Sequence, residues 1–197
     1  MRENIAIGQH LCYNDYSKLR RCKNRILNAK SLHKKTERNG RLLKLVCKNF
    51  TLSKVILYTD GACSVNPGPG GYCAILTYGK YEKVICGAEE HTTNNRMELR
   101  AVIEGLRALT RACDVTVVSD SKYVCDAVNQ HWLDSWQRNN WRKSNKDPVL
   151  NPELWKDLLQ LLQVHNVKFE WIKGHGGHPY NERCDKIAVE QYMQYKK

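Results

Sequence analysis

From about residue 55 onward, hydrophobic residues recur in short runs separated by turn-forming residues. Five runs are apolar throughout or alternate in polarity, as in strands that are buried on one or both faces. The expected strands are 55–59, 72–78, 81–89, 115–119 and 167–172. Gly79-Lys80 separates the second run from the third, which predicts a hairpin, and the Gly- and Pro-rich segment 61–71 predicts a tight turn.

Longer segments have the 3.6-residue spacing of amphipathic helices. In the segment 95–109, apolar side chains fall on one stripe. Further helices are expected through Tyr123 and Val128, over 152–164 with a proline near the first turn, and over 179–195. Strands that alternate with helices in this way predict an α/β fold with a sheet of mixed direction.

The first quarter of the chain differs in composition. The protein has 197 residues and a formal net charge of +12, from 32 Lys/Arg and 20 Asp/Glu. Residues 1–54 hold 14 of these basic and 3 of these acidic residues, so residues 55–197 are nearly neutral. Because the first segment has too few apolar residues for a core of its own, we expect a basic arm over 1–51, disordered or partly helical, and one catalytic domain over 52–197.

Three interpretations of this arm stay open. It could be a nucleic-acid-binding arm that acts through charge and does not read sequence. It could be an organelle transit peptide, although it is not rich in serine. It could also be a segment that is not part of the natural protein, included because the gene model starts too far upstream, since the domain pattern begins cleanly near Leu52. A transit peptide would direct the protein to an organelle, whereas otherwise we expect it in the cytoplasm.

The hydrophobic runs and the cysteines restrict the class of protein. No apolar stretch approaches the ~20 residues that span a bilayer, and the N-terminus lacks the apolar segment of a secretory signal. The nine cysteines are odd in number and form no CxxC pair, which predicts free thiols in a reducing compartment. We expect a soluble protein that has no membrane partner and acts as a monomer.

Two of the apolar strands end in the same way. One reads Val-Ile-Leu-Tyr-Thr-Asp60 and the other Val-Thr-Val-Val-Ser-Asp120. Fully apolar strands are usually central and parallel, and ligands bind beyond the carboxyl ends of such strands. If the two strands are neighbours, Asp60 and Asp120 lie side by side. Two close carboxylates repel unless a cation neutralises them, and a hard cation such as Mg²⁺ suits oxygen ligands.

Each acidic residue taken alone also has a structural interpretation. Asp60 could open a simple turn, and Asp120 could be the N-cap of the next helix. Glu98 could close a capping box with Asn95. Asp185 could be a solvated helix residue. These interpretations do not explain why the four acids occur together with the motifs that surround them.

Several motifs follow one another along the chain. They are Thr59-Asp60-Gly61-Ala62-Cys63, Asn66-Pro67-Gly68-Pro69-Gly70-Gly71-Tyr72, Thr92-Thr93-Asn94-Asn95-Arg96-Met97-Glu98-Leu99, Ser119-Asp120-Ser121, Lys173-Gly174-His175-Gly176-Gly177-His178-Pro179 and Asn181-Glu182-Arg183-Cys184-Asp185. Together they resemble bacterial-type ribonuclease H, type 1, over about three-quarters of the chain. The first 50 residues lie outside the resemblance, and they do not resemble the hybrid-binding domain of many eukaryotic relatives.

This resemblance implies a fold and a chemistry. The fold is a five-stranded mixed sheet, with its first three strands antiparallel, flanked by helices. The activity is endonucleolytic hydrolysis of the RNA strand of an RNA–DNA hybrid, which leaves 5′-phosphate and 3′-hydroxyl ends. The resemblance places Asp60, Glu98, Asp120 and Asp185 together as ligands of two Mg²⁺ ions, for which Mn²⁺ could substitute.

Further residues match positions near the family's site. His175, in a glycine-flanked loop, is expected to shuttle a proton or to help product leave, although a loop histidine can also be a plain surface residue. Asn181 matches a position beside the acids. Because RNA differs from DNA by its 2′-hydroxyl, substrate choice needs hydrogen-bonding groups in the minor groove. The residues that match contacts to the hybrid are Cys63 through its backbone, Asn66, Asn94, Asn95 and, at a DNA-strand phosphate, Thr93.

The segment 132–146 resembles the basic protrusion, or handle, of the bacterial enzymes. Trp132 and Trp136 share one helix face, which suits packing as well as contact with substrate. Basic side chains of the handle are expected at phosphates of the DNA strand. They are Arg138, Arg142, Lys143 and Lys146.

Two features depart from the familiar pattern. Gln137 and Asn139 dilute the charge of the handle, and Lys122 stands where the family usually has Gln. Both are expected to change binding strength more than chemistry.

Three rival functions are weighed against the resemblance. An integrase-like nucleotidyl transferase would lack the block from Asn94 to Glu98, and a hybrid-binding module without catalysis would lack one of the acids. A reverse-transcriptase fragment would be revealed by a polymerase encoded upstream.

Overall fold

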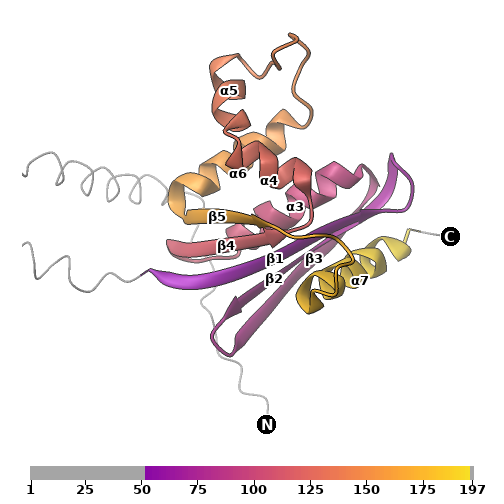
Figure 1. Cartoon of the computed structure of the whole chain (residues 1–197). Coiled ribbons are helices and arrows are strands. Elements are labelled where there is room, and N and C mark those ends of the chain that lie inside the picture. Colours follow the sequence, from indigo (N-terminus) through magenta and orange to yellow (C-terminus); the bar gives the residue numbers. More distant parts are fainter. Residues whose placement is uncertain (1–51, 196–197) are drawn as a thin grey trace, which may run out of the picture. The chain divides into compact units, whose positions relative to one another are not determined.

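A single five-stranded sheet organises residues 52–195, the part of the chain that the computed structural model describes (Figure 1). Its strands are β1 (Ser53–Cys63), β2 (Gly68–Tyr78), β3 (Tyr81–Thr92), β4 (Cys113–Ser119) and β5 (Asn166–Trp171). Their order across the sheet is β3-β2-β1-β4-β5; β2 is antiparallel to β1 and β3, and β4 is parallel to β1 and β5. The expected mixed sheet is confirmed, whereas the arm expected over 1–51 lies outside the described residues.

Helices cover both faces of this sheet (Figure 1). They are α3 (Asn94–Arg107), α4 (Lys122–Asn129), α5 (Trp132–Arg138), α6 (Pro152–Val164) and α7 (Pro179–Met193). The main core lies between the sheet and α3, α4 and α6, and it includes Leu57, Leu99 and Trp155, each fully buried. A smaller core on the opposite face joins Cys73 and Ile75 of β2 to Cys184 and Ala188 of α7. None of the helices within 52–195 is long and apolar enough to cross a bilayer.

The expected turn over 61–71 is wrong for most of its length. β1 continues to Cys63 and β2 begins at Gly68, so most of this segment lies in strands rather than in a turn. The glycines allow close packing: a Cβ on Gly71 would stand 2.2 Å from the carbonyl oxygen of Ala188, and one on Gly70 would stand 2.5 Å from the side chain of Thr92. The glycines of this segment therefore serve the close packing of helices and strands, not a turn.

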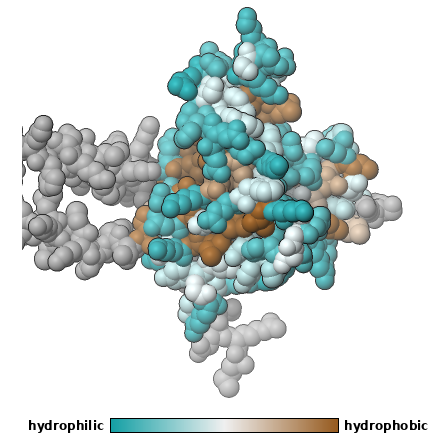
Figure 2. Space-filling view, viewed as in Figure 1, coloured by the Kyte–Doolittle hydropathy of each residue, from teal (hydrophilic) through white to brown (hydrophobic). Residues whose placement is uncertain are grey.

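The expected hairpin and helices are largely confirmed. Tyr78 pairs with Tyr81 around Gly79, whose φ of +56° suits a residue without a Cβ. α3 begins one residue earlier than expected, at Asn94, and ends at Arg107. The helix α5 projects from α4 and α6 (Figure 1), and hydrophilic residues cover most of this projection on the face that Figure 2 shows.

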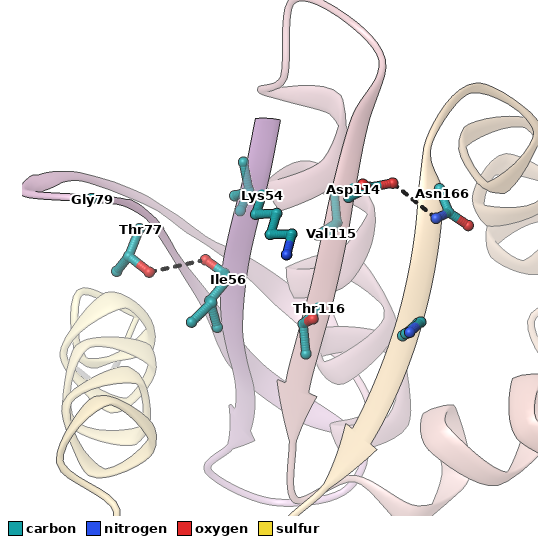
Figure 3. Close-up of a pocket in the computed structure, with 10 residues that line it drawn as sticks. Lys54, Ile56, Thr77, Gly79, Asp114, Val115, Thr116 and Asn166 are labelled. Atoms are coloured by element: carbon teal, nitrogen blue, oxygen red, sulfur yellow. Dashed lines mark hydrogen bonds between the residues drawn. The ribbon is translucent and has the colours of Figure 1, made fainter. Parts of the chain in front are cut away.

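A shallow groove lies at the amino ends of the three parallel strands, where each strand begins (Figure 3). Its volume is about 500 Å³, and Lys54, Thr116 and Lys168 are among the residues that line it. Asn166 donates a hydrogen bond to Asp114 across its floor, at 2.8 Å. The groove is therefore at the opposite end of β1 and β4 from Asp60 and Asp120.

Candidate active site

Asp60 and Asp120 occupy equivalent positions on neighbouring strands. The parallel pairing of β1 with β4 runs as far as Thr59 and Ser119, and the two aspartates follow directly. Asp60 stays in β1 and pairs with Cys73 of β2, so it does not open a turn. Only 8% of the Asp60 surface is exposed. The sheet therefore brings the two carboxyl groups to one edge and buries one of them.

Burial and repulsion together disfavour the charged form of Asp60. Its burial is the largest effect and the nearby carboxylate of Asp120 the next, and together they raise the pKa of Asp60 to about 8. The N–H of Gly61 donates to Asp60 Oδ1 at 2.7 Å, which opposes the rise. Asp185 and Glu98 add to this repulsion, so each of the other three acids disfavours the charged form of Asp60.

Glu98 reaches the same place from α3, and two side chains hold it. Asn94 donates from Nδ2 to one carboxylate oxygen at 2.9 Å, and Ser121 donates from Oγ to the other at 2.5 Å. Burial, opposed by these hydrogen bonds and assisted by Asp120, raises the pKa of Glu98 to about 7. The capping-box interpretation is wrong: the N-cap of α3 is Thr93, whose side chain makes no capping bond.

Ser121 is a site residue that the sequence analysis missed. Its hydroxyl accepts from the N–H of Val124, so Ser121 rather than Asp120 is the N-cap of α4, and the same hydroxyl donates to Glu98. A serine followed by a helical stripe was the available signal for the cap. The bond to Glu98 joins residues 23 apart in the sequence, which no local pattern reveals.

Ser121→Ala is expected to lower kcat about 10- to 100-fold with little change in KM, the usual effect of removing a group that orients a metal ligand, which is the role expected for Glu98. Loss of the cap should also cost about 1 kcal/mol of stability. Steady-state kinetics on an RNA–DNA hybrid and thermal unfolding measure the two effects separately. Ser121→Thr keeps the hydroxyl and serves as the control; if both variants lost kcat equally, the hydroxyl would not be what holds Glu98.

Two glycines allow close approach at the acids, one between β1 and the start of α3 and one between the loop after β5 and Asp120. A Cβ on Gly61 would lie 2.3 Å from the backbone nitrogen of Glu98, so α3 rests directly on β1 at this point. A Cβ on Gly174 would lie 2.6 Å from Asp120 Oδ2, so the loop after β5 rests on Asp120. His175 follows in this loop, exposed and with a φ of +51°. The loop thus carries His175 to the rim of the acidic cluster.

The helix α7 brings the last two residues. Asn181 is buried and donates from Nδ2 to Asp120 Oδ2 at 3.2 Å. Within 52–195 its Oδ1 has no hydrogen-bond partner, so one buried acceptor remains beside the acids. Asp185 lies one turn further along α7, half-buried, and its charge contributes to the raised pKa of Asp60.

The acidic cluster lacks a compensating cation among the described residues. Over 52–195, no Lys, Arg or His side chain forms an ion pair with Asp60, Glu98, Asp120 or Asp185. In the same range no three His, Cys, Asp or Glu side chains are arranged to hold a metal ion. Four partly buried carboxylates without a cationic partner are nevertheless the oxygen ligands that a hard divalent cation prefers.

The residues expected to contact the hybrid fall into two groups. The first lies where the β1–β2 turn meets the start of α3: Gly68 pairs with Thr92, and Cys63 donates from Sγ to the Thr92 carbonyl at 3.7 Å. This contact brings Cys63 to the residue before Thr93, the N-cap of α3, and Asn94 in the first turn of that helix donates to Glu98. Asn66 lies between β1 and β2, and Asn95 lies in the first turn of α3.

The second group lies on α5, in the projection. Trp136 packs edge-on against the buried Trp155, with ring centroids 5.5 Å apart, so it belongs to the core. Trp132 is 36% exposed, 6.1 Å from Trp136 between centroids. Arg138 is exposed and donates from Nε to the Asp134 carbonyl. Trp132 and Arg138 are therefore accessible to a ligand, whereas Trp136 is mainly a packing residue.

Comparison with known proteins agrees with these observations. The family model for RNase H matches residues 52–193. The "Ribonuclease H" of Caldicellulosiruptor saccharolyticus is 58% identical over 137 residues, which cover 70% of this chain and 94% of that protein. The "Ribonuclease H" of Pelobacter propionicus is 56% identical over 146 residues, which cover 74% and 89%.

Solved structures agree in fold. A crystal structure of LC9-RNase H1, a type 1 RNase H with the type 2 active-site motif, has a TM-score of 0.67 and 28% identity, and the match covers 75% of each chain. The structure of LC11-RNase H1 in complex with an RNA/DNA hybrid has a TM-score of 0.55 and 23% identity over 73% of this chain and 99% of that one, a likeness of fold alone. On the family match and the close relatives together, this chain belongs to the ribonuclease H family.

Proposed function

We propose that this ribonuclease H hydrolyses the RNA strand of RNA–DNA hybrids at the site formed by Asp60, Glu98, Asp120 and Asp185. The observation that carries the proposal is the set of mutually repelling carboxylates at the ends of β1 and β4, without a basic partner among the described residues. Such a set is stable when ionised only if divalent cations are bound to it. Mg²⁺ is the proposed ion, and Mn²⁺ is a substitute.

The chemistry follows from the donor set. Two divalent cations bound to these carboxylates would activate the attacking water and stabilise the leaving 3′ oxygen. The remaining residues orient the ligands: Asn181 holds Asp120 by a hydrogen bond, and Ser121 and Asn94 hold Glu98. The products would carry a 5′ phosphate and a 3′ hydroxyl.

His175 is proposed to act at the rim of the site. It is exposed, and its loop rests on Asp120 at Gly174. Its imidazole can both accept and donate a proton, so it is suited to pass a proton to or from the cleaved phosphate and to help product leave. The ring has no hydrogen bond to another described residue that would hold it in one place.

Recognition of the hybrid is assigned to the two groups of contact residues. The cluster around the start of α3 would read the 2′-hydroxyls in the minor groove, close to the acids. The accessible part of the projection, Trp132 and Arg138, would contact the DNA strand, where a guanidinium suits a phosphate. The substrate would then span from the acids to α5. The protein is proposed to do this as a monomer in the cytoplasm, without a membrane partner.

A cleavage assay tests the proposed function. Labelled RNA–DNA hybrid, single-stranded RNA and duplex RNA are each incubated with the full chain in Mg²⁺ or in EDTA. The expected result is cleavage of the RNA strand of the hybrid alone, and only in Mg²⁺. Equal cutting of all three substrates, or cutting in EDTA, would refute the proposal.

The affinity for Mg²⁺ is expected to rise with pH. In the metal-free protein the pKa of Glu98 is about 7 and that of Asp60 about 8, so both carry protons at pH 6 that a bound cation must displace. Because metal binding releases these protons, the dissociation constant should fall at least about tenfold between pH 6 and pH 8. Calorimetric titration at the two pH values, with the number of protons released measured in two buffers, checks this. A constant affinity would mean that neither acid is a ligand.

A further inference from the structure

Lys122 holds a positive charge at the edge of the acidic cluster. It is the first residue of α4, two positions after Asp120, and its side chain is exposed. The ammonium lies over the ring of Trp171 at the end of β5, with Nζ 4.9 Å from the ring centroid. The indole in turn donates from Nε1 to the main-chain carbonyl of Asp120 at 2.9 Å. The charge is therefore fixed, through one side chain, to the backbone of a catalytic acid.

This ammonium is not used inside the protein. Among residues 52–195 it has no carboxylate within ion-pair distance, although Asp120 is only two positions away in the sequence. The ammonium lies instead over the ring of Trp171, which is itself 45% exposed. An exposed lysine over an aromatic ring loses side-chain freedom before any ligand arrives, which reduces the entropy cost of binding.

From this geometry we infer that Lys122 binds a phosphate of the substrate strand that flanks the phosphate being cut. The inference rests on the proposed function, because the acids define which phosphate is cut. An ammonium is a point charge that suits a phosphate oxygen, and every nucleic-acid strand offers one phosphate per nucleotide. Phosphate contacts set the position of a nucleic acid on a protein. Lys122 thus positions the strand at the acids without taking part in the chemistry.

Salt dependence distinguishes a phosphate contact from a neutral one. Each phosphate that a cationic side chain neutralises adds roughly 0.7–0.9 to the slope of log affinity against log salt concentration. Lys122→Gln keeps a long hydrogen-bonding side chain and removes the charge, whereas Lys122→Arg keeps the charge. Lys168→Gln is the matched control, because Lys168 is an exposed lysine of β5 that lines the groove at the far end of the sheet.

The experiment measures binding of a fluorescent RNA–DNA hybrid to the full chain at five salt concentrations. All variants carry Asp60→Asn so that the hybrid is not cut. Lys122→Gln is expected to weaken binding several-fold at 0.1 M salt, as roughly one lost phosphate contact implies, and to reduce the slope by about 0.7–0.9. Lys122→Arg and Lys168→Gln should keep the slope of the parent protein.

Three outcomes would overturn the inference. One is an unchanged slope in Lys122→Gln, which would leave at most a neutral contact. Another is an equal loss in Lys168→Gln, which would reflect net charge alone. The third is a changed Mg²⁺ affinity with an unchanged slope, which would mean that the ammonium screens the acids. If the parent protein fails to bind the hybrid at all, the proposed function fails instead, so the two failures are distinguishable.

A double-mutant cycle tests the part assigned to Trp171. Trp171→Leu should weaken hybrid binding when Lys122 is present and have no further effect when residue 122 is glutamine, because the ring acts through the ammonium. Additive losses in the two backgrounds would contradict this part and leave Trp171 as an independent contact. Circular dichroism of each variant shows that the comparison is between folded proteins.

Discussion

Asp60→Asn is expected to lower the rate of RNA cleavage by about 10³-fold or more while the hybrid still binds. Asp60 is the most buried of the four acids, and it lies among the other three. An amide keeps the size of the side chain but is a poorer ligand for a divalent cation. Single-turnover cleavage and binding in the same buffer separate the two effects. Normal cleavage by this variant would remove Asp60 from the site.

The same substitution is expected to stabilise the metal-free protein at pH 8. The pKa of Asp60 is about 8 in the folded protein against an ordinary value of 3.8, so the folded state binds this proton more tightly than the unfolded state. A group of this kind favours folding below pH 4, and its contribution is lost as the pH rises from about 4 to 8. Asparagine has no proton to lose.

The expected gain is on the order of 1–3 kcal/mol at pH 8 and close to zero at pH 4. Each kcal/mol corresponds to roughly 2–4 °C in Tm for a domain of this size. Calorimetry in EDTA at the two pH values measures it. Asp157→Asn, at a partly exposed residue that pairs with Arg107, is the control and should change stability by less than about 1 kcal/mol at both pH values. A gain that did not depend on pH would contradict the electrostatic explanation.

Gly61→Ala is expected to damage both stability and catalysis. The added Cβ would meet the backbone nitrogen of Glu98 at 2.3 Å and the backbone carbon of Met97 at 2.4 Å, and backbone cannot rotate away as a side chain can. The helix α3 must therefore move. Overpacking of this kind costs about 1–3 kcal/mol or more, and a displacement of about 1 Å at a catalytic group costs about 10²-fold in rate.

Gly79→Ala is the comparison for this variant. Gly79 has open space around its α-carbon, and only its φ of +56° opposes a side chain. It should lose about 1 kcal/mol or somewhat more of stability and keep its activity, because the hairpin it closes does not support the acids. Thermal unfolding and cleavage rates of both variants are compared. If Gly61→Ala lost no more activity than Gly79→Ala, the contact between β1 and α3 would not hold Glu98 in place.

The sequence predicted the centre of the sheet well because the runs in β1 and β4 are apolar. Val55–Thr59 and the run before Asp120 are central and parallel, as their composition indicated. The predicted strand boundaries are wrong where glycine serves packing. The segment 61–71 has the composition of a turn, yet Gly70 and Gly71 lie in β2 against α3 and α7. A local pattern does not distinguish a glycine that bends the chain from one that admits a neighbour.

Strand ends and motifs predicted the acids, but they did not predict the residues that hydrogen-bond to the acids. Ser121 was known only as part of a motif, and its bond to Glu98 depends on how α3 and α4 pack. The hydrogen bond from Asn181 to Asp120 likewise joins α7 to a strand end 61 residues away. The cation over Trp171 arises because the end of β5 lies beside the start of α4. Such contacts join residues that are distant in the sequence, so the hydrophobic periodicity of helices and strands does not predict them.

The place of α7 has a consequence for synthesis on the ribosome. Three of the acids emerge by residue 120, whereas Asp185 and the Asn181 that holds Asp120 emerge only with α7. The same helix covers the apolar face of β2 through Cys184 and Ala188. A growing chain that lacks α7 therefore has an incomplete set of acids and an uncovered second core. Folding of this last helix therefore both closes the domain and completes the set of acids.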